Sequence, residues 1–253
     1  MDNMQADSIY DRPDLYDLLA PSDSAIEQFY ADMARGQGDR VLDLACGSGR
    51  LAIPLAQAGA KVVGGDLSPR MLQRAQLAAK KRGVEVELVE LDMRDFDLKG
   101  RQFDTIVVAM NSILHLHSQD DFRGFFQSVA RHLSHNGKLI FDAFVPSLTL
   151  LNRGPDERQL VGKIADSELG NITVEETVRY DPIAQMSHVE WYWSTDEKRD
   201  FWKTPLKMRQ IFPQEMPLLV SLGGLRLVER FGDFDRSAFV SGSRRQVCVC
   251  ALP

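Results

Sequence analysis

The chain has 253 residues, with 30 Lys and Arg against 36 Asp and Glu, so its formal net charge is −6. This length suits one medium-sized domain, or one domain with a sizeable insertion. Nucleic-acid binding depends on neutralising phosphates, so an acidic chain without a long basic run argues against a nucleic-acid partner. Apolar runs are too short for a membrane span, and the polar, acidic start is unlike a signal peptide. We expect a cytoplasmic protein with no membrane partner.

The first predicted elements are helical. Residues 24–35 have the apolar spacing of an amphipathic helix, and a segment that carries Tyr10 and Tyr16 precedes them. We expect residues 1–36 to form a helical cap on the domain that follows.

Strand and helix signals alternate from about residue 41 to residue 143. Residues 69–82 have apolar side chains at helical spacing, with Ser68 before them as N-cap and Gly83 after them as C-cap. A second such helix covers about 122–133. This alternation predicts a parallel sheet with helices on both faces. The predicted strands are residues 41–44, 61–66, 85–91, 103–109 and 138–143.

The periodicity changes after residue 150 to that of antiparallel strands joined by turns. A helix near 213–222 follows, and two closing strands, 225–231 and 246–251, suit a hairpin at the edge of the sheet. The predicted strands of the antiparallel segment are residues 160–167, 171–180, 185–195 and 204–212.

These elements predict an α/β fold. We expect a doubly wound, mostly parallel seven-stranded sheet with helices on both faces and a closing antiparallel hairpin. Residues 1–150 and 213–253 would form this core. Residues 151–212 would form an antiparallel β insertion after the fifth strand, serving acceptor binding as a lid, or dimerisation.

A glycine-rich turn follows the first predicted strand. The sequence V-L-D-L-A-C-G-S-G-R at 41–50 runs from an apolar strand into Gly-Ser-Gly, and the next strand ends on Asp66. Glycines let the backbone approach a ligand closely, and a carboxylate at the end of the second strand can accept hydrogen bonds from both ribose hydroxyls. The pattern predicts a nucleotide-cofactor site.

Two cofactors compete for this turn. Residues 47–52 fit the dinucleotide fingerprint G-x-G-x-x-A, and Asp66 suits the ribose of NAD. However, Asp43 precedes the turn, and a carboxylate there would repel a pyrophosphate. Asp43 suits a cationic ligand such as S-adenosylmethionine, which carries an ammonium and a sulfonium but no phosphate.

The segment D-L-A-C-G-S-G at 43–49 resembles motif I of the class I S-adenosylmethionine-dependent methyltransferases. Segments at 65–72, 91–96, 103–112 and 132–142 follow in that family's order. The chain looks in particular like small bacterial methyltransferases that modify amines or natural-product scaffolds. The resemblance implies S-adenosyl-L-methionine as cofactor, no metal, and methyl transfer to nitrogen or oxygen of a small-molecule acceptor. The protein would be a monomer or a homodimer.

Three other functions stay open: a methyltransferase acting on RNA or protein, an NAD-dependent oxidoreductase, and a non-catalytic cofactor-binding module.

The resemblance also implies roles for single residues. Asp43 would hold the ammonium of the cofactor, Asp66 the ribose, and Asp92 the adenine amino group. Met71 and Met93 would contact the cofactor or pack in the core. Asp92 has an alternative role as a helix or turn cap. Arg94 would bind a ligand or form a salt bridge with Asp95 or Asp97. The cofactor-binding set is Tyr16, Asp43, Ala45, Cys46, Gly47, Gly49, Asp66, Leu67, Met71, Asp92, Met93, Met110 and Asn111. Ala45 departs from the family, because many members have glycine there.

A base is needed only if the acceptor starts protonated. The candidates are His115, which follows the fourth strand, and Tyr10 or Tyr16. His115 has an alternative role in fixing its loop or touching the cofactor. His132 and His135 flank a turn and should be exposed.

The candidate acceptor-binding residues are Asn111, His115, Trp191, Trp193 and Arg209. Strand alternation puts Trp191 and Trp193 on one face of the insertion and Tyr192 on the other. The tryptophans would wall an acceptor pocket or form a dimer interface. Arg209 would hold an anionic or carbonyl group of the acceptor, or make an exposed salt bridge.

The three cysteines show neither metal-ligand nor disulfide spacing. We expect Cys46 to pack within the turn rather than act as a nucleophile. Cys248 and Cys250, two residues apart, should face the core from one strand.

Overall fold

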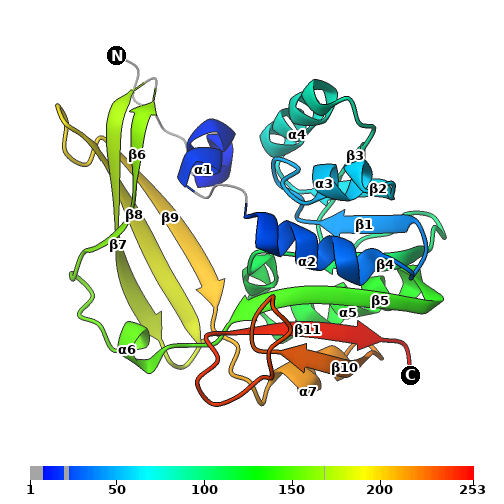
Figure 1. The fold of residues 1–253 in the computed structure, drawn as a ribbon. Helices are drawn as coiled ribbons and strands as arrows, with labels where there is room; N and C mark the ends of the chain where they lie inside the picture. The colour runs from blue at the N-terminus through cyan, green and yellow to red at the C-terminus, as the bar shows by residue number, and fades with distance from the viewer. Residues whose placement is uncertain (1–7, 20–22, 168) are drawn as a thin grey trace. The chain divides into compact units, whose positions relative to one another are not determined.

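The computed structural model describes residues 8–19, 23–167 and 169–253 (Figure 1). The chain divides into two compact units. One comprises Met1–Pro21 and Pro146–Gln210, and the other comprises Ser22–Val145 and Ile211–Pro253.

The larger unit contains the predicted seven-stranded sheet, in the order β10-β11-β5-β4-β1-β2-β3 (Figure 1). Neighbouring strands from β1 to β5 pair in parallel, and β11 is antiparallel to both β5 and β10. The predicted fold class and closing hairpin are therefore confirmed. The strands are β1 (Arg40–Leu44), β2 (Lys61–Asp66), β3 (Glu87–Glu90), β4 (Phe103–Val108), β5 (Leu133–Phe144), β10 (Arg226–Phe231) and β11 (Arg245–Ala251).

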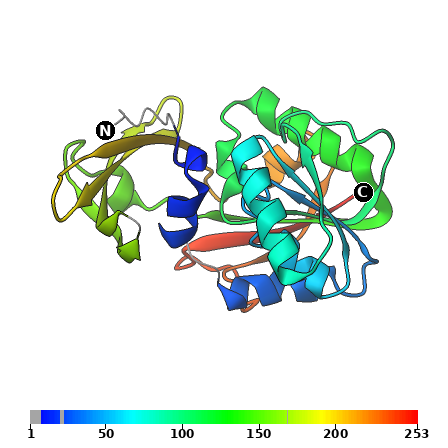
Figure 2. The ribbon, with the colours of Figure 1, turned by 90° about the horizontal axis from the view of Figure 1, so that it is seen from above.

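Helices cover both faces of this sheet. One face packs against α2 (Ser24–Ala34), α3 (Ala52–Gln57) and α4 (Pro69–Arg82). The other face packs against α5 (Gln119–His132) and α7 (Met216–Ser221). Figure 2 shows α5 on one side of β5 and β11, and α2 on the other. The carboxyl ends of β1, β2 and β4 therefore meet at one sheet edge between the two helical layers.

The predicted ends of α4 are confirmed. The Ser68 side chain accepts a hydrogen bond from the Met71 amide, Pro69 occupies the first turn, and Gly83 ends the helix at a φ of 67°. β5 begins earlier than predicted, at Leu133 rather than 138. Gly137 permits this, because a Cβ there would lie 2.9 Å from the Phe103 carbonyl oxygen of β4.

The smaller unit is a four-stranded antiparallel sheet in the order β6-β7-β8-β9. A short helix α6 (Leu148–Leu151) leads into it, and two N-terminal elements, η1 (Ile9–Asp11) and α1 (Pro13–Leu19), pack against one face. The strands are β6 (Gln159–Ser167), β7 (Gly170–Asp181), β8 (Met186–Thr195) and β9 (Trp202–Arg209).

The helical cap expected over residues 1–36 is divided between the units. η1 and α1 share an apolar cluster with the insertion, whereas α2 packs in the larger unit. Residues 1–7 and 20–22 of that cap lie outside the described residues. Across the described part of the chain, no helix has the length and apolar character needed to cross a membrane.

Candidate functional site

The turn after β1 has a backbone that glycine favours at three positions. Ala45, Gly47 and Gly49 have φ values of 54°, 55° and 84°. Gly49 also lacks room for a side chain, because a Cβ would lie 3.0 Å from Ile53. A Cβ on Gly47 would instead meet open space. The turn is thus packed against the protein below Gly49 and open to a ligand at Gly47.

Replacing Ala45 by glycine is expected to stabilise the protein by about 1 kcal/mol, because the left-handed conformation costs an L-residue that amount. Chemical denaturation with urea measures the change. Ala78→Gly, within α4, is the matched control and should destabilise by about 1 kcal/mol. Equal losses for both variants would contradict the strain assigned to Ala45.

Asp66 at the end of β2 organises the turn. Its Oδ2 accepts a hydrogen bond from the Gly47 amide at 2.8 Å, and its Oδ1 accepts one from the Ser68 amide at 2.8 Å. Burial raises the pKa of this carboxyl above its usual range, and the two amides oppose the rise. Each oxygen retains a lone pair, so the carboxylate can still accept hydroxyl donors.

Two apolar residues of the predicted cofactor-binding set, Leu67 and Met71, differ in exposure. Leu67 is 61% exposed although it directly follows Asp66, so its side chain is available to a ligand. Met71 is buried in the core. This burial favours the packing alternative for Met71.

Asp43 on β1 is a buried carboxyl group with an unsatisfied oxygen. The residue is 2% exposed, and its Oδ2 has no hydrogen-bond partner among the residues that the structure describes. Burial raises the pKa of Asp43 to about 8, the Asp66 carboxylate adds to the rise, and the Ala52 amide opposes it. A cation beside Oδ2 would satisfy this group and stabilise its ionised form.

Asp92 lies in the loop after β3, and its carboxylate is paired with Arg94. The Arg94 guanidinium donates to both carboxylate oxygens, and its amide donates to Oδ1 at 2.9 Å. The prediction that Arg94 would pair with Asp95 or Asp97 is therefore wrong. The pair lowers the pKa of Asp92. Asp92 thus stabilises the loop turn and remains a candidate for binding the adenine amino group. Met93 is half-buried and remains a candidate cofactor contact.

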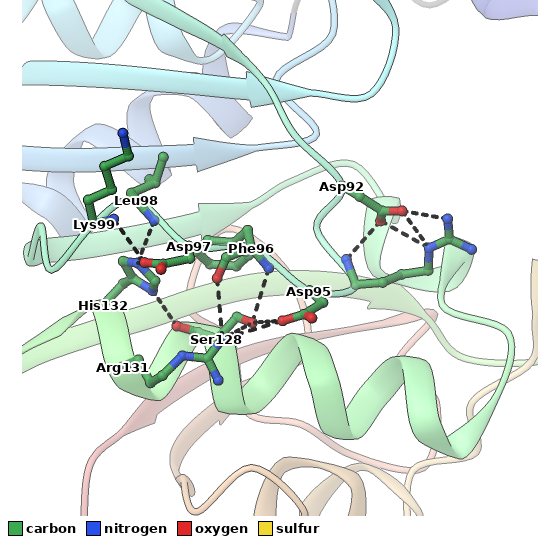
Figure 3. A network of polar contacts seen from close by, with 10 residues as sticks. Asp92, Asp95, Phe96, Asp97, Leu98, Lys99, Ser128, Arg131 and His132 are labelled. Atoms are coloured by element: carbon green, nitrogen blue, oxygen red, sulfur yellow. Dashed lines mark hydrogen bonds and ion pairs between the residues drawn. The ribbon is translucent and has the colours of Figure 1, made fainter.

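Helix α5 anchors the same loop (Figure 3). Ser128 Oγ accepts a hydrogen bond from the Phe96 amide at 3.2 Å, and Arg131 donates to the Phe96 carbonyl at 3.3 Å. His132 Nε2 accepts from the Leu98 amide at 2.9 Å, and its Nδ1 lies 2.7 Å from the Ser128 carbonyl. His132 is only 2% exposed, so the expectation of an exposed side chain is wrong. It packs on Phe96 and fixes the loop that carries Asp92.

Met110 and Asn111 form the turn after β4. Asn111 Oδ1 accepts a hydrogen bond from the Phe144 amide at 2.8 Å. Both residues also donate backbone hydrogen bonds to Asp142, a buried carboxyl group on β5 that receives the Tyr30 hydroxyl as well. Sequence reasoning missed Asp142 and Tyr30. The available signal was a carboxylate within an otherwise apolar strand.

His115 ends the 3-10 turn η2 (Ser112–His115), which follows β4. Burial lowers the pKa of His115 to about 4, and repulsion from His117 adds to the effect. The imidazole is therefore neutral at pH 7 and a weak base. This favours hydrogen bonding over proton removal from an ammonium.

Four of the remaining candidates share the smaller unit. The rings of Tyr10 and Tyr16 lie 5.5 Å apart, and those of Trp191 and Trp193 lie 6.3 Å apart. All four belong to the apolar cluster that η1 and α1 form with the sheet of the smaller unit. Trp193 is fully buried, and its indole donates to Thr204 Oγ1 at 3.0 Å, so it serves the core of this sheet. Tyr10, Tyr16 and Trp191 are half-buried.

Arg209 supports a turn within the smaller unit. Its guanidinium donates to the Gln185 carbonyl, the Gln185 side chain and the Gln210 carbonyl. Gln185 is the left-handed residue between β7 and β8, at a φ of 51°. These bonds give Arg209 a structural role in the turn. Its contact with an acceptor stays a prediction.

The cysteines pack as expected. Cys46, Cys248 and Cys250 are all buried. Burial raises the pKa of the Cys46 thiol well above its usual range, which disfavours a nucleophilic thiolate. Within the described ranges, no three His, Cys, Asp or Glu side chains gather as a metal site requires.

These features suit a nucleoside site in a Rossmann-like fold. The open Gly47 backbone, the Asp66 acceptor and the unsatisfied Asp43 oxygen fit a phosphate-free, cationic nucleoside. Residues 41–137 match the protein family described as "Methyltransferase domain". Residues 41–137 thus resemble a methyltransferase domain, and the sheet around them has a Rossmann-like fold.

Known proteins resemble part of the chain in sequence. A putative methyltransferase, YqeM of Bacillus subtilis, is 39% identical over 103 residues, which cover 41% of each chain. The chain spans about half or less of the length of the curated relatives that it matches.

Solved structures resemble nearly the whole chain. The CcbJ methyltransferase from Streptomyces caelestis has a TM-score of 0.81 at 24% identity, covering 97% of this chain and 96% of its own. The sugar N-methyltransferase KedS8 from Streptoalloteichus has a TM-score of 0.69 at 23% identity, covering 95% and 92%. These likenesses show the fold, including the insertion.

Proposed function

We propose that the protein transfers the methyl group of S-adenosylmethionine to a nitrogen, or an oxygen, of a small-molecule acceptor. The observation that carries this proposal is the unsatisfied Asp43 oxygen beside the glycine turn. An ammonium there satisfies a buried carboxylate, whereas a pyrophosphate would add negative charge near Asp43 and Asp66. The likeness in fold to KedS8, a sugar N-methyltransferase, supports a small-molecule nitrogen acceptor.

The residues have defined tasks in this proposal. Asp43 holds the ammonium of the cofactor, Asp66 accepts the ribose hydroxyls, and the exposed Leu67 covers the adenine. S-adenosylmethionine supplies an electrophilic methyl group on a sulfonium. The protein contributes by orienting the acceptor toward this group and excluding water. An acceptor amine that arrives uncharged needs no base, in agreement with the weak basicity of His115.

Turnover is the test of this proposal. The purified protein is incubated with S-adenosylmethionine and a panel of aminosugars, aliphatic amines and phenols, and S-adenosylhomocysteine is quantified by mass spectrometry. We expect acceptor-dependent product with at least one amine and none with Asp43→Ala. Cofactor binding without product from any acceptor in the panel would contradict methyl transfer to small molecules and favour the non-catalytic module.

A further inference from the structure

The turn that ends β4 has a backbone that its residues disfavour. Met110 and Asn111 have φ values of 58° and 63°, and the Ser112 amide donates to the Ala109 carbonyl at 3.2 Å. Two positive φ values inside such a hydrogen bond are typical of a type I′ turn, which favours glycine and asparagine. A methionine held in this conformation needs surrounding contacts that enforce it.

Asp142 and Tyr30 provide these contacts. Asp142 Oδ1 accepts hydrogen bonds from the Met110 amide at 2.7 Å and the Tyr30 hydroxyl at 2.6 Å. Its Oδ2 accepts from the Asn111 amide at 3.2 Å. Both side chains are buried, so water does not compete for these bonds. The turn is held from β5 and α2 together.

This arrangement fixes the direction of one carbonyl group. The peptide bond between Met110 and Asn111 is trans, so the Met110 carbonyl points opposite to the Asn111 amide and hence away from Asp142. The carbonyls on either side are occupied, since Ala109 accepts from Ser112 and Asn111 accepts from Leu114. The Met110 carbonyl accepts no hydrogen bond from any residue that the structure describes.

The position of this carbonyl gives it a candidate partner. β4 is the neighbour of β1, with Asp43 in register with Val107, so the turn and the glycine turn share one edge of the sheet. We propose that the Met110 carbonyl accepts a hydrogen bond from the N–H of the methyl acceptor, and that Asp142 and Tyr30 are positioning residues for it. This inference rests on the proposed function. It narrows the acceptor to an amine that bears at least one hydrogen.

Sinefungin tests this inference without a known acceptor. It carries an amine where S-adenosylmethionine has its S-methyl group, so it presents N–H donors at the transfer position. S-adenosylmethionine also has a positive charge there but only C–H groups. Comparing the two affinities therefore separates the effect of the hydrogen bond from that of the charge. We expect calorimetry to show sinefungin binding about tenfold more tightly, the typical contribution of one hydrogen bond to a charged group.

The variants test the positioning role. Asp142→Asn should bring the two affinities to within about threefold, because its amide nitrogen faces a backbone donor. Tyr30→Phe retains both backbone bonds and should reduce the preference at least about twofold, which keeps the test decisive if Asp142→Asn does not fold. Tyr192→Phe is the control. The Tyr192 hydroxyl lies 3.4 Å from Thr177 Oγ1 in the smaller unit, so its removal should leave the preference for sinefungin unchanged.

The outcomes separate the two proposals. A general loss of stability would weaken both ligands equally and leave the ratio unchanged. A wild-type protein that binds both ligands without preferring sinefungin, or variants that keep the wild-type ratio, would overturn the role of Met110. A protein that binds neither ligand would instead overturn the proposed function, and this inference with it.

Discussion

Asp66→Ala is expected to weaken S-adenosylmethionine binding at least tenfold. The substitution removes the acceptor for the ribose hydroxyls and releases the Gly47 and Ser68 amides that the carboxylate now orders. Each lost hydrogen bond to a charged group contributes about 1.5–3 kcal/mol. Isothermal titration calorimetry measures the affinity, and circular dichroism verifies that the variant is folded.

Glu90→Ala is the matched control for this substitution. Glu90 ends the neighbouring strand in register with Asp66, but its side chain is exposed. It should retain wild-type affinity. Unchanged binding in folded Asp66→Ala would show that the nucleoside does not contact the end of β2.

S-adenosylmethionine binding is expected to strengthen with pH between about 6 and 7.5. The pKa of Asp43 in the free protein is about 8, so the carboxyl group is mostly protonated in this range and must lose its proton to hold an ammonium. The gain approaches tenfold per pH unit. Calorimetry in buffers of different ionisation enthalpy would detect the released proton.

Asp43→Asn separates this proton from other titrations. The variant should bind about ten- to hundredfold more weakly at pH 7.5, because it lacks the charge that holds the ammonium, and its pH dependence should be lost. Asp39→Asn, an exposed site just before β1, is the control. A wild-type protein with pH-independent affinity and no proton release would contradict the assignment of Asp43.

Folding stability provides an independent check on Asp43. Its folded pKa, about 8, exceeds the usual value of 3.8, so its protonated form stabilises the folded state below pH 3.8 and this contribution is lost as pH rises through 8. Unliganded Asp43→Asn should therefore melt at a higher temperature than the wild type at pH 8. A lower melting temperature for the variant would contradict this.

The sequence predicted the fold because its local signals agree. The cap residues Ser68 and Gly83 bound α4 as expected, and the alternation of strand and helix signals leads to the observed parallel sheet. The beginning of β5 was missed because Leu133 both ends α5 and pairs with Phe103, a tertiary contact that no local pattern contains.

The sequence could suggest candidate cofactor residues on β1 and β2 because the turn and the strand ends lie close in sequence, and their contacts with a cofactor stay a prediction. The contact between Tyr30 and Asp142 could not be predicted, because 112 residues separate them and Tyr30 lies outside the segments that resemble the family. His132 was misjudged for a related reason. Its burial depends on the loop after β3, whose Leu98 amide lies 34 residues earlier in the chain.

The division of the N-terminal segment also depends on tertiary contacts. Ile9 and Leu15 pack with Ile164, Val174 and other apolar residues of the insertion. The spacing of apolar residues predicted helices there but did not identify the sheet that they cover. Tyr10, Tyr16 and Trp191 belong to this cluster, and their roles in acceptor recognition stay a prediction.

A crystal structure of the protein with S-adenosylhomocysteine tests the central claim most directly. We expect the ribose hydroxyls on the Asp66 carboxylate, the amino group of the homocysteine portion near Asp43 Oδ2, and the ligand backbone beside Gly47. Density for the nucleoside away from the ends of β1 and β2, or a requirement for a pyrophosphate ligand over Gly47 and Gly49, would contradict the account.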